Sequence, residues 1–216
     1  MFTQTLSAIA VLATLANAHF GIDYPEMRGD SFAEGASQYI FPCANVNQTT
    51  ATNRTQWPLT GGSLSLDLHH QWTYVFVNLG LGTDYPVFNI SLTPQLLNET
   101  GNGTLCLPSV ALPAGLQIAD GQNASVQVVT VGESGSALYN CADITFSSTA
   151  TTLGADTCSN SSNVAVAAVG ASSANASSTD TAAAAASSTS TSGAASTVGS
   201  SFGTVVLAAL VAGYVL

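Results

Sequence analysis

The sequence predicts an all-β domain, an antiparallel β-sandwich of the immunoglobulin-like type, from three observations. From residue 63 onward apolar and polar residues alternate, with Leu64, Leu66 and Leu68 on one face. Several short segments rich in β-branched and aromatic residues lie between Gly, Pro and Asn turns. No long segment has a helical period of apolar residues. Short strands joined by tight turns are typical of two packed antiparallel sheets.

The N-terminus has the features of an export signal. Residues 9–15 are apolar, and Ala16-Asn17-Ala18 has the small-x-small pattern after which signal peptidase cleaves. We therefore expect residues 1–18 to be a signal peptide and His19 to be the first residue of the mature protein. A free N-terminal histidine offers its α-amine and its imidazole Nδ1 to one metal ion. Square-planar nitrogen ligation is typical of Cu(II) and Ni(II).

The strands are expected after an extended N-terminal segment and a polar loop. They are predicted from residue 63 onward and at 72–79, 88–92, 105–107, 125–131 and 138–146. Turn signals separate them, for example Thr60-Gly61-Gly62 and Asp120-Gly121. The expected domain spans residues 19–158.

Cysteines and glycosylation signals indicate a secreted eukaryotic protein. The four cysteines lack the close pairs of zinc sites, so they predict two disulfides in one of three connectivities: Cys43, Cys106, Cys141 and Cys158. Eight Asn-x-Ser/Thr sequons predict a glycoprotein; they begin at Asn47, Asn53, Asn89, Asn98, Asn102, Asn123, Asn160 and Asn175.

Beyond Cys158 the composition changes to Ser, Thr, Ala and Gly. Such a stretch buries too little apolar surface to fold, so residues 159–192 are predicted to be a disordered, O-glycosylated linker. The apolar tail 204–216 is too short for a comfortable transmembrane helix. Small residues, a polar spacer and this tail predict a GPI-anchor signal at 193–216, with the anchor near Ser192.

Charge restricts the possible partners. The chain has two Lys and Arg residues in total, both arginines, against twelve acidic residues, a formal net charge of −10. Nucleic-acid binding requires basic surface that neutralises phosphate, and this composition excludes it.

Three histidines, His19, His69 and His70, are the candidate nitrogen ligands. Neighbouring residues of a strand point to opposite faces, so only one of the pair should reach a metal held by His19. Alternation places His70 with the inward leucines and His69 with Ser65 and Asp67, which favours His70. If the strand ends here, His69 remains the alternative.

Asp143 is the candidate third ligand. It shares a face with Cys141 in an apolar strand, where a carboxylate must be paired, metal-bound or at an edge. Spacing alone does not distinguish it from the other candidate acids, Asp23, Asp67 and Asp84.

Several motifs resemble the fungal LPMO-like copper-binding proteins, the copper acquisition factor family. They are Ala18-His19-Phe20, Leu59-Thr60-Gly61-Gly62, His69-His70-x-Trp72, Asp120-Gly121-x-Asn123-Ala124 and Cys141-Ala142-Asp143-Ile144. The resemblance implies the fold of the lytic polysaccharide monooxygenases (LPMOs) and a histidine brace without polysaccharide cleavage. Carried over, the brace would be His19, His70 and Asp143. Gln71 stands where the family often has Pro, and Ala44-Asn45 where it often has Gly-Gly.

Together these observations predict a cell-surface Cu(II)-binding protein for copper acquisition or homeostasis, and not an enzyme. The expected protein is monomeric and GPI-anchored on the outer face of the plasma membrane, close to the cell wall. It would pass copper to a membrane copper transporter. The alternatives are a copper-dependent lytic polysaccharide monooxygenase and a structural cell-wall glycoprotein without metal.

Overall fold

A computed structural model describes residues 19–49, 53–84 and 86–170. The predicted signal peptide, most of the predicted linker and the GPI-anchor signal lie outside the described residues. Within the described ranges, no helix has the length and apolar character needed to cross a membrane.

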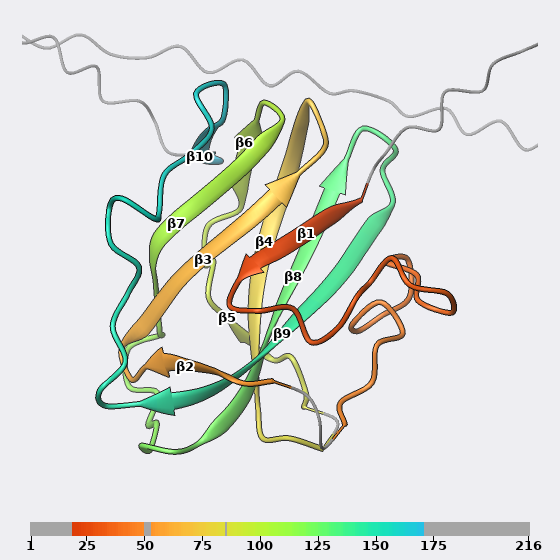
Figure 1. Cartoon of the computed structure of the whole chain (residues 1–216). Coiled ribbons are helices and arrows are strands. Elements are labelled where there is room, and N and C mark those ends of the chain that lie inside the picture. The colour runs from red at the N-terminus through yellow and green to blue at the C-terminus, as the bar shows by residue number, and fades with distance from the viewer. Residues whose placement is uncertain (1–18, 50–52, 85, 171–216) are drawn as a thin grey trace, which may run out of the picture. The chain divides into compact units, whose positions relative to one another are not determined.

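Two β-sheets form the described part of the chain (Figure 1). One has the strand order β1-β3-β7; the other has the order β10-β6-β4-β8-β9-β2, with β5 beside β4. The all-β sandwich prediction is confirmed. The strands are β1 Phe20–Tyr24, β2 Thr55–Pro58, β3 Gly61–Leu68, β4 Trp72–Leu81, β5 Ile90–Ser91, β6 Leu97–Thr100, β7 Gly103–Ala111, β8 Asn123–Gly132, β9 Ala137–Ser147 and β10 Ala165–Ala168.

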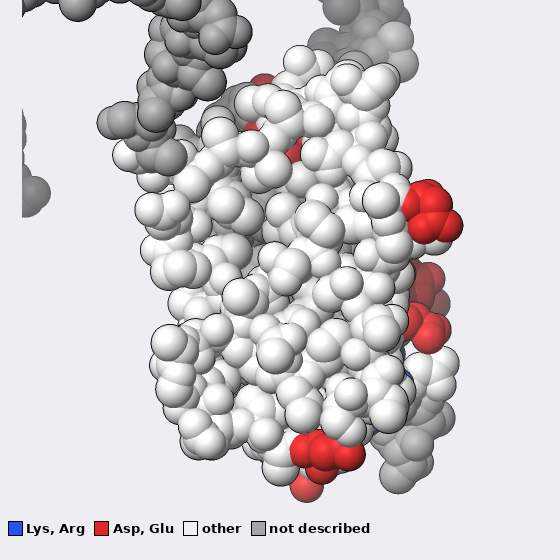
Figure 2. All heavy atoms as spheres, turned by 90° about the vertical axis from the view of Figure 1, so that its left-hand side faces the viewer, with Lys and Arg blue, Asp and Glu red and all other residues white. Residues whose placement is uncertain are grey.

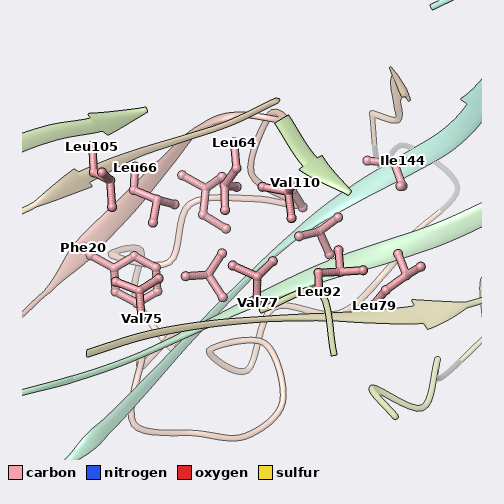
Figure 3. Close-up of a cluster of buried hydrophobic side chains, with 14 of the residues drawn as sticks. Phe20, Leu64, Leu66, Val75, Val77, Leu79, Leu92, Leu105, Val110 and Ile144 are labelled. Atoms are coloured by element: carbon pink, nitrogen blue, oxygen red, sulfur yellow. The ribbon is translucent and has the colours of Figure 1, made fainter. Parts of the chain in front are cut away.

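The hydrophobic core lies between the two sheets (Figure 3). Leu64 and Leu66 of β3 face Val75 and Val77 of β4, and at most 1% of the surface of any of these four residues is exposed. These residues occupy alternate positions of their strands, as the sequence pattern predicts. Burial of one face of each strand therefore fixes which side chains point outward, because a one-residue slip would reverse both faces.

The two disulfides select one of the three possible connectivities. Cys43 pairs with Cys141, and Cys106 pairs with Cys158. The first joins the loop after β1 to β9, and the second joins β7 to the segment after β9. Each sheet is thus linked covalently to a segment outside its strands.

Four elements differ from the sequence prediction. The strand expected at 88–92 is reduced to β5, and neither β2, which pairs in parallel with β9, nor β6 was expected. Strand β10 pairs with β6 inside the segment assigned to the linker. The predicted domain boundary at Cys158 is therefore too early, because a strand of Ala and Val can complete a sheet edge despite its simple composition.

Charged side chains are sparse on the surface. The face in Figure 2 is mostly uncharged, with acidic groups near its margins. This is expected for a chain in which 6% of residues are charged.

Candidate metal site

Strand pairing brings the N-terminal histidine to the histidine pair. Strand β1 runs antiparallel to β3, with Phe20 opposite Leu68. His19 therefore precedes β1 at the same end of the sheet at which His69 and His70 follow β3. Residues 50 positions apart in the sequence lie at the same end of the sheet because the two strands are neighbours.

The start of β1 is held by a buried glutamine. The backbone N–H of Phe20 donates to Gln38 Oε1 at 3.1 Å, and Gln38 Nε2 donates to the Phe20 carbonyl at 2.7 Å. Gln38 Nε2 also donates to Ser31 Oγ at 2.8 Å. Since Gln38 is fully buried, these bonds fix the backbone next to His19.

The two residues of the histidine pair have different environments. His69 is exposed, and its Nε2 lies 2.9 Å from Asp67 Oδ2. His70 is buried, with 9% of its surface exposed. A Cβ atom added to Gly132 would lie 2.9 Å from both Cε1 and Nδ1 of His70, so the Nδ1 edge of this ring packs over β8. The burial of the pair agrees with the alternation that favoured His70.

An exposed aromatic rim, formed by Phe32 and Tyr39 of the loop after β1, lies beside His19. The His19 ring lies 5.7 Å from the Phe32 ring and 6.1 Å from the Tyr39 ring, measured between centroids. Phe32, Tyr39 and Phe41 are all more than half exposed. From the sequence this segment was predicted only to be a polar loop. Its aromatic residues were missed because they are scattered and follow no strand or helix period.

Asp143 lies at the centre of a buried hydrogen-bond network. It is fully buried, and it accepts hydrogen bonds from Arg28 Nε at 3.0 Å and Nη2 at 2.9 Å. Gln48 Nε2 donates to it at 2.8 Å and Ser125 Oγ at 2.5 Å. A bidentate arginine and two further donors satisfy this carboxylate without a metal.

The structure does not bring Asp143 to the histidines. Asp143 pairs with Ser125 on β8, whereas His70 packs over Gly132, seven residues farther along the same strand. At about 3.3 Å per residue, this corresponds to about 20 Å. The described residues contain no group of three or more His, Cys, Asp or Glu side chains close enough to hold a metal ion.

Glu99 is the buried acid at the histidine end of the sandwich. It is fully buried on β6 and pairs with Thr73 of β4, which in turn pairs with Gly132. Burial raises the pKa of Glu99 from 4.5 to about 7. The sequence analysis missed this residue, although it shares strand parity with Leu97.

Arg28 is the second residue that sequence reasoning missed. The amino-acid composition could have indicated it. The chain has only two Lys or Arg side chains, so each is a candidate partner for a buried carboxylate. The acid that it neutralises is Asp143, 115 residues away in the sequence.

A family model described as "Copper acquisition factor BIM1-like" matches residues 17–163. The chain belongs to this family. Membership of the BIM1-like family gives the protein a copper-related function, and it confirms the resemblance found in the sequence motifs.

Curated relatives of this BIM1-like chain carry LPMO-like names. The lytic polysaccharide monooxygenase-like protein ham-7 of Neurospora crassa is 38% identical over 165 residues, which cover 68% of this chain and 71% of the relative. A lytic polysaccharide monooxygenase-like protein of Emericella nidulans is 37% identical, covering 65% and 70%. The X325 protein of the same description in Aspergillus fumigatus is 35% identical, covering 74% and 80%.

Proposed function

We propose that this protein binds Cu(II) through a histidine brace made of the His19 α-amine, the His19 imidazole and the His70 imidazole. The observation that supports this proposal is the pairing of β1 with β3, because His19 precedes β1 at the end of the sheet where His69 and His70 follow β3. The proposal requires cleavage after Ala18. The backbone nitrogen of His19 can bind the metal as an amine only when it is the free N-terminus and not part of a peptide bond.

The donor set fits copper. Three nitrogen donors from two histidines are the ligands that Cu(II) prefers. The Nδ1 edge of His70 faces β8, which leaves Nε2, on the other side of the ring, as its metal-binding nitrogen. Copper bound there would supply a redox-active cation, and the chain's own residues would hold and orient it.

Asp143 as the third ligand stays a prediction that its contacts do not support. Both of its oxygens accept hydrogen bonds from Arg28. We therefore assign this carboxylate to Arg28 and leave it out of the proposed brace.

The cellular setting is part of the proposal. The export signal, the sequons and the C-terminal signal support a glycosylated protein held by a GPI anchor on the outer face of the plasma membrane. The family description, a copper acquisition factor, supports acquisition of copper there, and we propose that the copper then passes to a membrane copper transporter.

Titration of the mature protein with Cu(II) tests the brace. We expect tight binding with proton release, because the amine and imidazoles must be unprotonated to bind. His19→Ala, His70→Ala and one extra residue before His19 should each weaken binding by orders of magnitude.

His69→Ala is the matched control, since His69 lies next to His70 but is exposed and bonded to Asp67. It should bind copper as the unmodified protein does. Loss of binding in His69→Ala with normal binding in His70→Ala would mean that the other histidine is the ligand.

Oxidative polysaccharide cleavage is the second candidate function, favoured by the exposed aromatic rim beside His19 and by the names of the relatives. We expect no cleavage, because a buried carboxylate near the site, that of Glu99, favours Cu(II) over Cu(I). The copper-loaded protein is incubated with reductant, peroxide, chitin and cellulose, followed by mass spectrometry. Copper-dependent oxidised oligosaccharides, absent with His19→Ala, would establish the monooxygenase function instead.

A further inference from the structure

The Glu99 carboxylate is buried without a hydrogen-bond partner. None of its surface is exposed, and neither Oε1 nor Oε2 has a partner among the described residues. The same holds for the Oγ1 of Thr130, which is buried on β8 two residues before Gly132. A buried acid that lacks a partner destabilises the fold. An apolar residue of similar size at this position would give a more stable protein. Its presence calls for a partner that the folded chain alone does not supply.

The chain has no spare cation for Glu99. Its only Lys or Arg residues are Arg28 and Arg54. Arg28 is bound to Asp143, and Arg54 Nη1 donates to the carbonyls of Ala124 and Ile144. When Glu99 is ionised, the positive charge that balances it therefore has to come from a histidine or from a bound ion.

Glu99 lies on the His70 side of the core. Glu99, Thr73 and Gly132 are consecutive cross-strand partners on β6, β4 and β8, and all three are buried on the inner face. The Nδ1 edge of the His70 ring packs over Gly132. Neighbouring strands are about 4.8 Å apart, so the backbones of Glu99 and Gly132 are separated by about 10 Å. A glutamate side chain and an imidazole ring can span this gap between them.

We propose that Glu99 is the positioning residue of the histidine site: in the copper-bound protein its carboxylate would accept the Nδ1–H of His70 while Nε2 holds the metal. This inference rests on the proposed function. A metal-binding histidine commonly donates its other N–H to a carboxylate, which fixes the tautomer, orients the ring and makes the metal-binding nitrogen more basic. Glu99 thus gives the site the acidic charge that the sequence reading assigned to Asp143.

The test compares Glu99→Gln with two reference variants of the mature protein. Glutamine keeps the shape of Glu99 and removes its charge. Glu133→Gln removes the same charge from an exposed position in the turn after Gly132, and His70→Ala removes the proposed ligand. Each variant is titrated with Cu(II), its copper complex is recorded by electron paramagnetic resonance, and its copper-free form is melted.

We expect Glu99→Gln to weaken Cu(II) binding by about 10- to 100-fold, the usual effect of losing such a partner. Its copper spectrum should change, because the His70 ring is no longer held. The copper-free variant should melt no lower than the unmodified protein, since a buried unpaired acid is gone. Glu133→Gln should resemble the unmodified protein in all three measurements.

Two results would overturn the positioning role. The first is unchanged copper affinity and an unchanged spectrum in Glu99→Gln while His70→Ala fails to bind, which leaves the proposed function intact. The second is an equal loss in Glu133→Gln, which would reduce the effect to general charge. No Cu(II) binding by the unmodified mature protein would overturn the proposed function and this inference together.

Discussion

Asp143 and Glu99 are both fully buried carboxylates on inner strands, and they differ in their partners. Asp143 accepts hydrogen bonds from Arg28, Gln48 and Ser125, whereas Glu99 has no partner among the described residues. Sequence reasoning could identify Asp143 as a buried acid, because its strand is strongly apolar. It could not see the neutralising arginine, which lies 115 residues away. It missed Glu99 because the surrounding Asn, Thr and Gly residues resemble a polar turn.

Glu99 should make the stability of the copper-free protein depend on pH. Burial raises its pKa from 4.5 to about 7, so between these values the unfolded chain loses this proton while the folded chain keeps it. The free energy of unfolding should therefore fall as pH rises through this range, by at most about 3 kcal/mol.

Denaturant unfolding at several pH values measures this effect, with Glu99→Gln as the reference. The difference in stability between Glu99→Gln and the unmodified protein should grow from pH 4.5 to pH 7 and then level off. A constant difference would show that Glu99 titrates alike in the folded and unfolded chains.

At the scale of elements, the loop after β1 is fastened to β9 at several points. Met27 forms a β-bridge with Ala142, the Arg28 N–H donates to the Cys141 carbonyl at 2.8 Å, and Cys43 is bonded to Cys141. The Arg28–Asp143 ion pair adds to these contacts. Together they hold the aromatic rim in place beside the start of β1.

Asp143→Asn should destabilise the fold and leave Cu(II) affinity unchanged. The substitution leaves Arg28, whose side chain is 6% exposed, without its counter-charge. Breaking a buried pair in this way typically costs about 3–5 kcal/mol. Chemical denaturation and Cu(II) titration of the same preparation measure the two effects.

Asp23→Asn is the control for Asp143→Asn. Asp23 is an acid at the surface of β1, where partial loss of hydration and the charge of Asp67 raise its pKa, so its removal should cost little. Strongly reduced copper affinity in Asp143→Asn, with normal stability, would restore Asp143 as a ligand.

The sequence predicted long strands better than short ones. Strands β3, β4, β8 and β9 have many alternating apolar residues, and their prediction is confirmed. Strand β2 has four residues and ends in Pro58, and its parallel pairing with β9 depends on the assembled sheet. Strand β10 is built of Ala and Val, which composition alone assigns to a linker. Local periodicity therefore misses strands whose stability comes from a neighbour.

At the scale of the whole molecule, both arginines have partners within the chain. Arg28 pairs with the buried Asp143, and Arg54 donates to two backbone carbonyls. The fixed charges left to act on the surroundings are therefore carboxylates, consistent with a formal net charge of −10. Such a protein has a negative field that attracts small cations and speeds their encounter with its surface. Dissolved salt screens this field over about 8 Å at physiological ionic strength, so the rate of cation capture depends on salt more than the strength of coordination does.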